Sequence, residues 1–427
     1  MNPVFKKVMY PLFFGLMLFL SFNKHSKDKQ RSYHDVIWAD AAGYYVYNTI
    51  WFVYGNNAAA YPDSMDVKTG DGFSLDKNTN RVTTKYPCGT AILQSPFFLT
   101  AHLIASSLGY KKDGFSEIYS YLLYVSGMFY CFMAMLLLIG FLKRHFSSFI
   151  SIASVIVLFA ASNLFYYTID APGMSHIYSF FVFSCIIYLT PLLLANKSFN
   201  NLLLFFSLVV LALLIRPTNA FIALFPLFYN VYNSIDFRNR IRFFLEGKIS
   251  LLLSLLFSLI IAVPQMVYWK STFGHFISYG YRNERFDFWK NPKLIEVWFS
   301  AMNGLFIYTP LVLLCLLGVI IMLRNKDKLG IYIGLLFFLI SYIFASWWNW
   351  WFGCAFGARS FVEYYSLLII PFCYLWQFVK NRMALKITFF AFIAFCCFIN
   401  LSIEYYYDGC FYGNTWDYDA FFKLIVS

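Results

Sequence analysis

Residues 118–142, IYSYLLYVSGMFYCFMAMLLLIGFL, decide the fold class, because this long stretch contains no charged side chain. A helix needs about 20 predominantly apolar residues to cross the hydrocarbon core of a bilayer. The stretch meets that length without interruption. It therefore predicts a membrane-spanning helix, and the rest of the chain can be searched for others of the same kind.

The composition of the whole chain agrees with this prediction. Of the 427 residues, 60% are hydrophobic and only 13% are charged, and the chain contains 52 Phe and 33 Tyr. A soluble protein has too little interior to bury so much apolar surface. The formal net charge of +12 does not by itself indicate nucleic acid, because the placement of the charges matters more than their total. We expect an all-α polytopic membrane protein that binds no nucleic acid.

Apolar runs of suitable length predict about eleven membrane-spanning helices within a single integral domain over residues 1–427. The two shortest neighbouring runs are separated by Arg216-Pro217, where a proline ends one helix and begins the next. The predicted spans are 8–22, 118–142, 148–168, 174–195, 200–216, 218–234, 248–269, 303–323, 329–347, 364–380 and 386–404.

The distribution of basic residues predicts the orientation of these spans. With the N-terminus on the inner side, the inner segments hold fifteen basic and only three acidic residues, whereas the outer segments hold eighteen of each. An excess of Lys and Arg in short loops is typical of the cytoplasmic side of a membrane. The pattern predicts a cytoplasmic N-terminus and an outer C-terminus.

This orientation puts every long connection on the outer side: 23–117, 270–302, 348–363 and the tail 405–427. Long connections that are not low in complexity are usually functional. Within the first of them, residues 91–109 are apolar, but Gln94, Pro96 and His102 favour a helix lying in the membrane interface. Three of the nine cysteines lie in outer segments, which leaves room for one disulfide and one free thiol; they are Cys88, Cys354 and Cys410.

Two carboxylates follow the first apolar run, in the aromatic stretch 33–61, YHDVIWADAAGYYVYNTIWFVYGNNAAAY. A carboxylate near hydrocarbon is costly unless it is paired, hydrated or functional. We interpret Asp40, which shares a helix face with Gly43 and Tyr44, as a general base whose pKa is raised by partial burial. Asp35 is a second candidate. The alternative for Asp40 is a helix N-cap, which Asp favours.

Two cations come next, Arg81 and Lys85, and the second of them begins the segment 85–93, KYPCGTAIL. A Pro-x-Gly turn that opens a helix leaves backbone N–H groups free, and together with the cations these suit a phosphate group. The alternative is contact of both cations with anionic lipid headgroups.

The order of these elements resembles the GT-C glycosyltransferase superfamily, above all protein O-mannosyltransferases and lipid A aminoarabinose transferases. The shared features are a first helix, an outer loop with an acid in an aromatic helix, the Tyr-Pro-x-Gly segment, and many spans with short inner loops; motif similarity is confined to 35–100. The resemblance implies a polyprenyl-phosphate-linked sugar donor and an acidic role for Asp40. The mannosyltransferases have an adjacent Asp-Glu pair, whereas Ala41 follows Asp40 here, so a divalent metal stays an open question.

Later segments add further candidates. Asp170 and His176 lie between two spans, where they would orient an acceptor or bind a metal, or only form local hydrogen bonds. Arg216, at the outer end of a span, either holds an anion or reaches the headgroups. Arg359 follows the stretch 346–358, SWWNWWFGCAFGA, and resembles a late-loop arginine that faces the donor phosphate in these transferases.

These observations together predict a glycosyltransferase on the periplasmic face of a bacterial inner membrane. It would move a sugar from a polyprenyl-phosphate donor to a glycan, lipid or protein acceptor, with Asp40 and Arg359 meeting in one cavity. The predicted substrate-binding residues are Lys85, Arg81, Arg359, Arg216, Asp35, Asp170, His176 and His102. No cofactor motif is evident. The alternatives are a carrier or flippase for lipid-linked sugars, and a ligase or polymerase of surface polysaccharide.

Overall fold

The fold is known from a computed structural model that describes residues 3–27, 36–281, 284–406 and 417–426. Within these residues the protein is helical apart from one short hairpin, and this confirms the all-α prediction. The first helix is α1 (Pro3–Lys27). The segment after it contains α2 (Asp40–Thr49), α3 (Met65–Lys68), α4 (Gly89–Ile104) and the antiparallel strands β1 (Ser74–Asp76) and β2 (Arg81–Thr83).

The remaining helices follow in chain order, with short turns of 3-10 helix between several of them. The bounds are α5 (Glu117–Leu142), α6 (Ser148–Ala160), α7 (Leu164–Ile169), α8 (Ser175–Ala195), α9 (Phe199–Ile215), η5 (Pro217–Leu224), α10 (Phe225–Phe228), α11 (Ser234–Leu245), α12 (Lys248–Ser258), η6 (Leu259–Ala262), α13 (Val263–Phe273), α14 (Leu294–Phe299), α15 (Leu305–Tyr308), α16 (Leu311–Arg324), α17 (Lys328–Ala345), η7 (Arg359–Tyr364), α18 (Tyr365–Val379), α19 (Met383–Tyr406) and α20 (Tyr418–Val426).

Six helical segments among the described residues are long and apolar enough to cross a membrane: α5, α8, α12 to α13, α17, η7 to α18, and α19. Each coincides with a predicted span. Four other predicted spans fall on shorter apolar helices, at α6, α9, η5 to α10, and α16. The protein is thus an all-α protein with multiple candidate membrane spans.

Local chemistry explains why some predicted spans are shorter than expected. The run 303–323 is divided because Pro310, which has no N–H to donate, stands between α15 and α16. The run 148–168 is divided at Ser162 and Asn163, which separate α6 from α7. There the Ser162 hydroxyl donates to Leu158 O and also accepts from the Leu164 N–H. Side chains of this kind compete with the helical backbone hydrogen bonds.

Two groups of helices make up the core. In one group α5 packs on α8, α8 on α9 and α9 on α12; in the other, α16 packs on α17 and α18. Gly318 allows close approach in the second group, since a Cβ there would lie 1.9 Å from Pro371 O of α18. Contacts of η7 and of α18 with α8 join the two groups. The turn η7 therefore lies where the groups meet.

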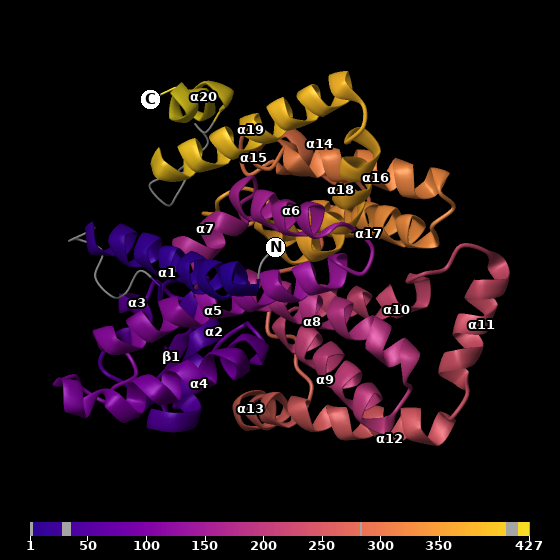
Figure 1. Cartoon of the computed structure of the whole chain (residues 1–427). Coiled ribbons are helices and arrows are strands. Elements are labelled where there is room, and N and C mark those ends of the chain that lie inside the picture. Colours follow the sequence, from indigo (N-terminus) through magenta and orange to yellow (C-terminus); the bar gives the residue numbers. More distant parts are fainter. Residues whose placement is uncertain (1–2, 28–35, 282–283, 407–416, 427) are drawn as a thin grey trace.

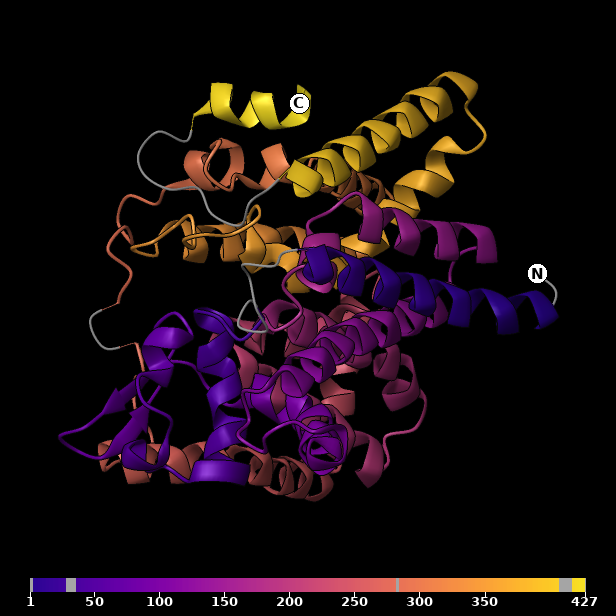
Figure 2. The same ribbon diagram turned by 90° about the vertical axis from the view of Figure 1, so that its left-hand side faces the viewer.

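The predicted first outer segment packs on the helical core. Figures 1 and 2 show α1 beside α5, and α4 packs on both α5 and α2. A Cβ on Gly89, at the start of α4, would lie 2.5 Å from the backbone N of Ile215. This close approach brings the 85–93 segment next to Arg216. A helix is confirmed within residues 91–109.

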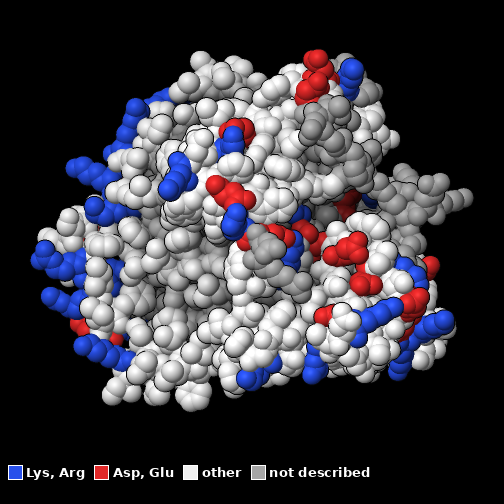
Figure 3. All heavy atoms as spheres, turned by 180° about the vertical axis from the view of Figure 1, so that it is seen from behind, with Lys and Arg blue, Asp and Glu red and all other residues white. Residues whose placement is uncertain are grey.

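Lys and Arg side chains gather along one edge of the molecule. They line the left margin of Figure 3, which is the edge that carries α11 in Figure 1. The face turned to the viewer in Figure 3 has acidic and basic side chains intermixed toward its right side. This gathering of Lys and Arg along one edge agrees with the charge pattern of the sequence, in which the excess of basic residues lies in one set of short loops.

Candidate functional site

Asp40 begins α2, immediately after a tight turn at Ala39. The backbone of Ala39 has φ 48°, an uncommon value for a residue with a Cβ, and its N–H donates to Thr69 O at 2.8 Å. No side chain caps this helix end, and the Asp40 carboxylate is turned away from the helix backbone toward Tyr86 and Arg359. The N-cap interpretation of Asp40 is therefore wrong.

Arg359 reaches Asp40 from the other end of the chain. Its Nη2 lies 2.7 Å from Asp40 Oδ2, and the two side chains are only 12% and 27% exposed. Gly357, with φ 65°, turns the backbone just before η7, and the Arg359 N–H donates to Gly357 O. The expectation that these two residues meet is confirmed. The positions are 319 residues apart, so only the tertiary fold brings them together.

Tyr86 holds the other oxygen of the same carboxylate. Its hydroxyl donates to Asp40 Oδ1. The Tyr86 ring lies directly against α2, because a Cβ on Gly43 would be 2.5 Å from the ring. Tyr44 packs on the ring from the side, with centroids 4.3 Å apart. Sequence reasoning missed Tyr86, since the segment was interpreted only through its neighbouring Lys85 and the turn after it.

The charge state of Asp40 differs from the expectation. Burial disfavours its ionised form, but the Arg359 guanidinium, the Tyr86 hydroxyl and the Lys85 ammonium together outweigh burial and lower the pKa of Asp40 below its usual value. The prediction of a raised pKa is wrong because it considered burial without the partners. Conversely, burial and the neighbouring Asp40 carboxylate raise the pKa of Tyr86 well above its usual value.

Asp40, Arg359 and Tyr86 all line a cavity of about 1090 Å³. Its walls also carry Lys85, Arg216, Asp170 and Glu284 from four other segments. Further aromatic groups on the walls are Trp38, Tyr44, Tyr86, Tyr166, Tyr167, Trp269, Tyr279, Tyr281, Phe286, Phe344, Trp347, Trp348 and Phe352. A volume of this size, with aromatic faces and a few converging charges, is typical of a binding site for a small molecule.

Four of the five cations that line the cavity have a carboxylate partner, and the fifth, Lys68, donates to Asp63 O. Lys85 Nζ lies 2.5 Å from Glu284 Oε1, and Arg216 Nη1 lies 3.2 Å from Glu363 Oε1. Lys24 Nζ, from the end of α1, lies 3.1 Å from Asp170 Oδ2. Sequence reasoning did not select Lys24, Glu284 or Glu363. Ion pairs between distant segments leave no pattern in the neighbouring sequence. The one available signal was that Glu363 follows Arg359 by four residues, the spacing of one helical turn.

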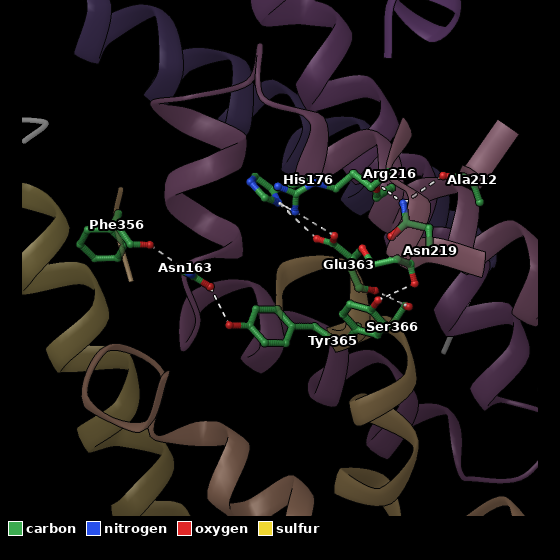
Figure 4. A network of polar contacts seen from close by, with 12 residues as sticks. Asn163, His176, Ala212, Arg216, Asn219, Phe356, Glu363, Tyr365 and Ser366 are labelled. Carbon is green, nitrogen blue, oxygen red and sulfur yellow. Dashed lines mark hydrogen bonds and ion pairs between the residues drawn. The ribbon is translucent and has the colours of Figure 1, made fainter. Parts of the chain in front are cut away.

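The partner of Arg216 belongs to a fully buried cluster (Figure 4). His176 Nδ1 lies 3.2 Å from Glu363 Oε2 and 3.3 Å from Arg216 Nη1, and both His176 and Glu363 are 0% exposed. Asn219 reinforces the surroundings by donating to Ser179 Oγ and Ala212 O. Arg216 alone extends from this cluster to the cavity wall. His176 itself does not line the cavity, but it contacts two residues that do, Arg216 and Tyr167.

Other predicted residues lie elsewhere. Arg81 is on β2, where its Nη1 contacts Asn56 O at 3.4 Å, and His102 Nδ1 contacts the Tyr119 hydroxyl at 2.7 Å; neither is among the described cavity residues. Asp35 is outside the described residues. Asp170 and His176 belong to different ion clusters. Within the described ranges no three His, Cys, Asp or Glu residues converge as metal ligands.

The cysteines fall into different classes. Cys354, on the cavity wall, is disulfide-bonded, whereas Cys88 is a buried free thiol; Cys410 is outside the described residues.

Comparison with known proteins does not identify this site, because no protein family and no curated protein matches the sequence.

Proposed function

We propose that this protein is a membrane glycosyltransferase of the GT-C type, which moves a sugar from a polyprenyl-phosphate donor to a hydroxyl of an acceptor. One observation carries the proposal: an acid and a guanidinium from opposite ends of the chain, Asp40 and Arg359, share one cavity with further cations. Acid–base groups beside anion-binding groups are what transfer from a phosphate leaving group requires.

In this mechanism the cations bind the lipid phosphate. Arg359 retains a buried Nε with no hydrogen-bond partner among the described residues, so it has a donor to offer while Asp40 holds its Nη2. Guanidinium groups suit phosphate oxygens because they present several donors in one plane. Lys85 and Arg216 add positive charge on the same cavity wall.

Asp40 then acts as the base. It accepts the proton of the acceptor hydroxyl while the acceptor oxygen bonds to the anomeric carbon, and the bond from that carbon to the phosphate oxygen breaks. The electron pair leaves with the phosphate, whose new charge is stabilised by Arg359, Lys85 and Arg216. The ionised form of Asp40, favoured by its neighbours, is the form that a base requires. One displacement of this kind inverts the anomeric configuration.

We place the cavity on the periplasmic side of a bacterial inner membrane, with about eleven crossings and a cytoplasmic N-terminus. Two observations support this orientation. The basic edge in Figure 3 has the charge of a cytoplasmic surface. Cys354, on the cavity wall, is disulfide-bonded, and disulfides persist in oxidising compartments.

The test uses the full chain in nanodiscs with two synthetic donors, an undecaprenyl-phosphate monosaccharide and an undecaprenyl-diphosphate oligosaccharide. A mixture of glycan, lipid and peptide acceptors is added, and products are identified by mass spectrometry. We expect transfer from the monosaccharide donor by the wild type and none by Asp40→Asn. Transfer only from the oligosaccharide donor would instead indicate a ligase. A parallel assay uses the full chain in sealed vesicles, where movement of either donor across the bilayer without product would indicate a carrier.

A further inference from the structure

One aromatic side chain of the cavity wall, Trp38, has an open ring face. Trp38 lines the cavity and is 50% exposed. Gly70 covers the other face of its ring, because a Cβ on Gly70 would lie 2.6, 2.8 and 3.0 Å from three atoms of the six-membered ring. Three neighbouring ring atoms at such similar distances put Gly70 over the ring and not at its edge. The exposed surface of Trp38 therefore includes the opposite face, which is turned to the cavity.

The ring is held in place by the backbone on both sides of it. Gly70 has φ 74°, a value that a residue with a Cβ rarely adopts. Next to it, Thr69 O accepts the Ala39 N–H at 2.8 Å, and a Cβ on Gly72 would lie 1.8 Å from Ala39 O. The turn at Ala39 and the turn that contains Gly70 are thus interlocked. An aromatic face fixed in this way is preorganised for a ligand.

The charges near Trp38 restrict the ligand. The face of an aromatic ring carries partial negative charge, so it disfavours an anion. A cation would be attracted to the ring but repelled by the Lys68 ammonium, which lines the cavity two positions before Gly70 and donates to Asp63 O at 2.8 Å. A neutral ring with C–H groups on its face and polar groups at its edge avoids both penalties. A pyranose sugar has this arrangement.

The position of Trp38 relates this face to the proposed base. Asp40 follows Trp38 by two residues and lines the same cavity. The Ala41 N–H donates to Trp38 O at 3.0 Å, so the backbone that carries Trp38 is bonded to the first turn of α2. A sugar ring stacked on Trp38 is therefore next to Asp40, where one of its edge hydroxyls can donate to the carboxylate.

We propose that the open face of Trp38 is a stacking platform for a neutral pyranose sugar, and that this sugar is the acceptor. The assignment to the acceptor rests on the proposed transferase function, whereas the platform itself does not. Stacking changes no covalent bond. It holds the sugar so that its edge, and not its face, is turned to Asp40.

The first experiment measures binding without any donor. The full chain in nanodiscs is titrated with methyl β-glucoside, with glucitol and with tetramethylammonium, and binding is followed by saturation-transfer NMR. Methyl β-glucoside has a rigid ring face, glucitol has hydroxyls without such a face, and tetramethylammonium is a cation that suits an aromatic ring. We expect the glucoside to bind at least about fivefold more tightly than either of the others.

Variants then locate the binding. Trp38→Ala should weaken the binding of methyl β-glucoside by about fivefold to fiftyfold, and Trp38→Phe, which keeps a smaller ring, should weaken it less. The matched control is Trp289→Ala, because Trp289 is also 50% exposed but is not among the described residues of the cavity wall. If both tryptophans only anchored the protein in the membrane interface, the two alanine variants would behave alike.

The thermal midpoint of each variant separates lost binding from lost folding, and Trp38→Phe remains informative if Trp38→Ala does not fold. Three results would overturn the platform. They are equal binding of the glucoside by wild type and Trp38→Phe, equal binding of glucitol and glucoside by the wild type, and displacement of the glucoside by tetramethylammonium.

The assignment to the acceptor is tested separately. In the transfer assay with a glycan acceptor, Trp38→Phe should raise the KM for the acceptor and leave the KM for the donor unchanged. A rise in the KM for the donor instead would overturn the assignment. If the wild type transfers no sugar at all but binds methyl β-glucoside through Trp38, the proposed function fails and the platform stands.

Discussion

Two arginine–carboxylate clusters, only one helical turn apart on η7, differ in what surrounds them. Arg359 extends from η7 to the cavity and meets Asp40, and the two side chains are 12% and 27% exposed. Glu363 extends from the same turn into the core and meets Arg216 and His176, where Glu363 and His176 are 0% exposed. Both arginines line the cavity, so the two pairs differ in the carboxylate: Asp40 also lines the cavity, whereas Glu363 does not.

The difference indicates how the two clusters divide their roles. When a charged side chain lines a cavity, it can exchange its ion-pair partner for a ligand, because water or substrate then replaces the lost hydrogen bonds. A fully buried carboxylate such as Glu363 cannot be replaced in this way, since its removal leaves the buried part of Arg216 without compensation in a medium of low dielectric constant. We therefore expect the loss of Asp40 to affect mainly activity and the loss of Glu363 to affect mainly stability.

The largest expected effect is on catalysis. Asp40→Asn keeps the shape of the side chain but cannot accept the proton, so we expect transfer to fall by about 10²- to 10⁴-fold. Stability should change by no more than about 1 kcal/mol, because the remaining Arg359 faces the cavity. Turnover and denaturant unfolding in detergent measure the two quantities. Wild-type turnover in Asp40→Asn would remove this carboxylate from the mechanism.

The second effect is on stability. Glu363→Gln removes the charge that compensates the buried part of Arg216, and we expect a loss of about 3–5 kcal/mol in the free energy of unfolding. The double variant Glu363→Gln with Arg216→Met should recover part of this loss, because neither charge is then left alone. Unfolding of both variants in detergent checks this. A loss in Glu363→Gln no larger than in Asp40→Asn would erase the contrast between the clusters.

The third effect is on donor binding. Arg359→Ala should weaken the binding of an undecaprenyl-phosphate sugar by about tenfold to a hundredfold, because a hydrogen-bonded charge is lost. Arg359→Lys should restore part of it, since Lys keeps the charge without the planar donors. Equilibrium binding of a fluorescent donor to both variants measures this, with Glu296→Gln as a control remote from the cavity. Unchanged affinity in Arg359→Ala would assign this arginine to structure.

The helical class could be predicted from regular features of the sequence, whereas the meeting of Asp40 with Arg359 was expected from the resemblance to the GT-C transferases together with the charge pattern. Apolar runs mark helices whatever their neighbours are, and both residues lie in long segments placed on the same side by the charge pattern. The division of the run 303–323 at Pro310 was also visible in principle, since proline disrupts the backbone hydrogen bonds of a helix.

The remaining features depend on tertiary contacts. Nothing local to Glu363 shows that its partners are Arg216 and His176, which come from the ends of two other helices. The same is true of Tyr86, whose hydroxyl reaches Asp40 only because Gly43 lets its ring lie against α2. Without these partners the direction of the pKa shift of Asp40 could not be predicted, because burial and pairing act in opposite senses.

The smallest expected effect concerns pH. Because the pKa of Asp40 is lowered in the folded protein, its ionisation stabilises the fold fully above the unfolded pKa of about 3.9, and this stabilisation is lost as pH falls through the lower folded pKa. The stability difference between wild type and Asp40→Asn should therefore be constant between about pH 5 and 8 and should shrink below about pH 4. Arg359→Ala removes the guanidinium that favours ionisation, so the acid limb of its residual kcat/KM should move to higher pH than in the wild type. If the limb stays in place, the pair does not set the ionisation of the base, and exposure to the cavity no longer distinguishes the two clusters on η7.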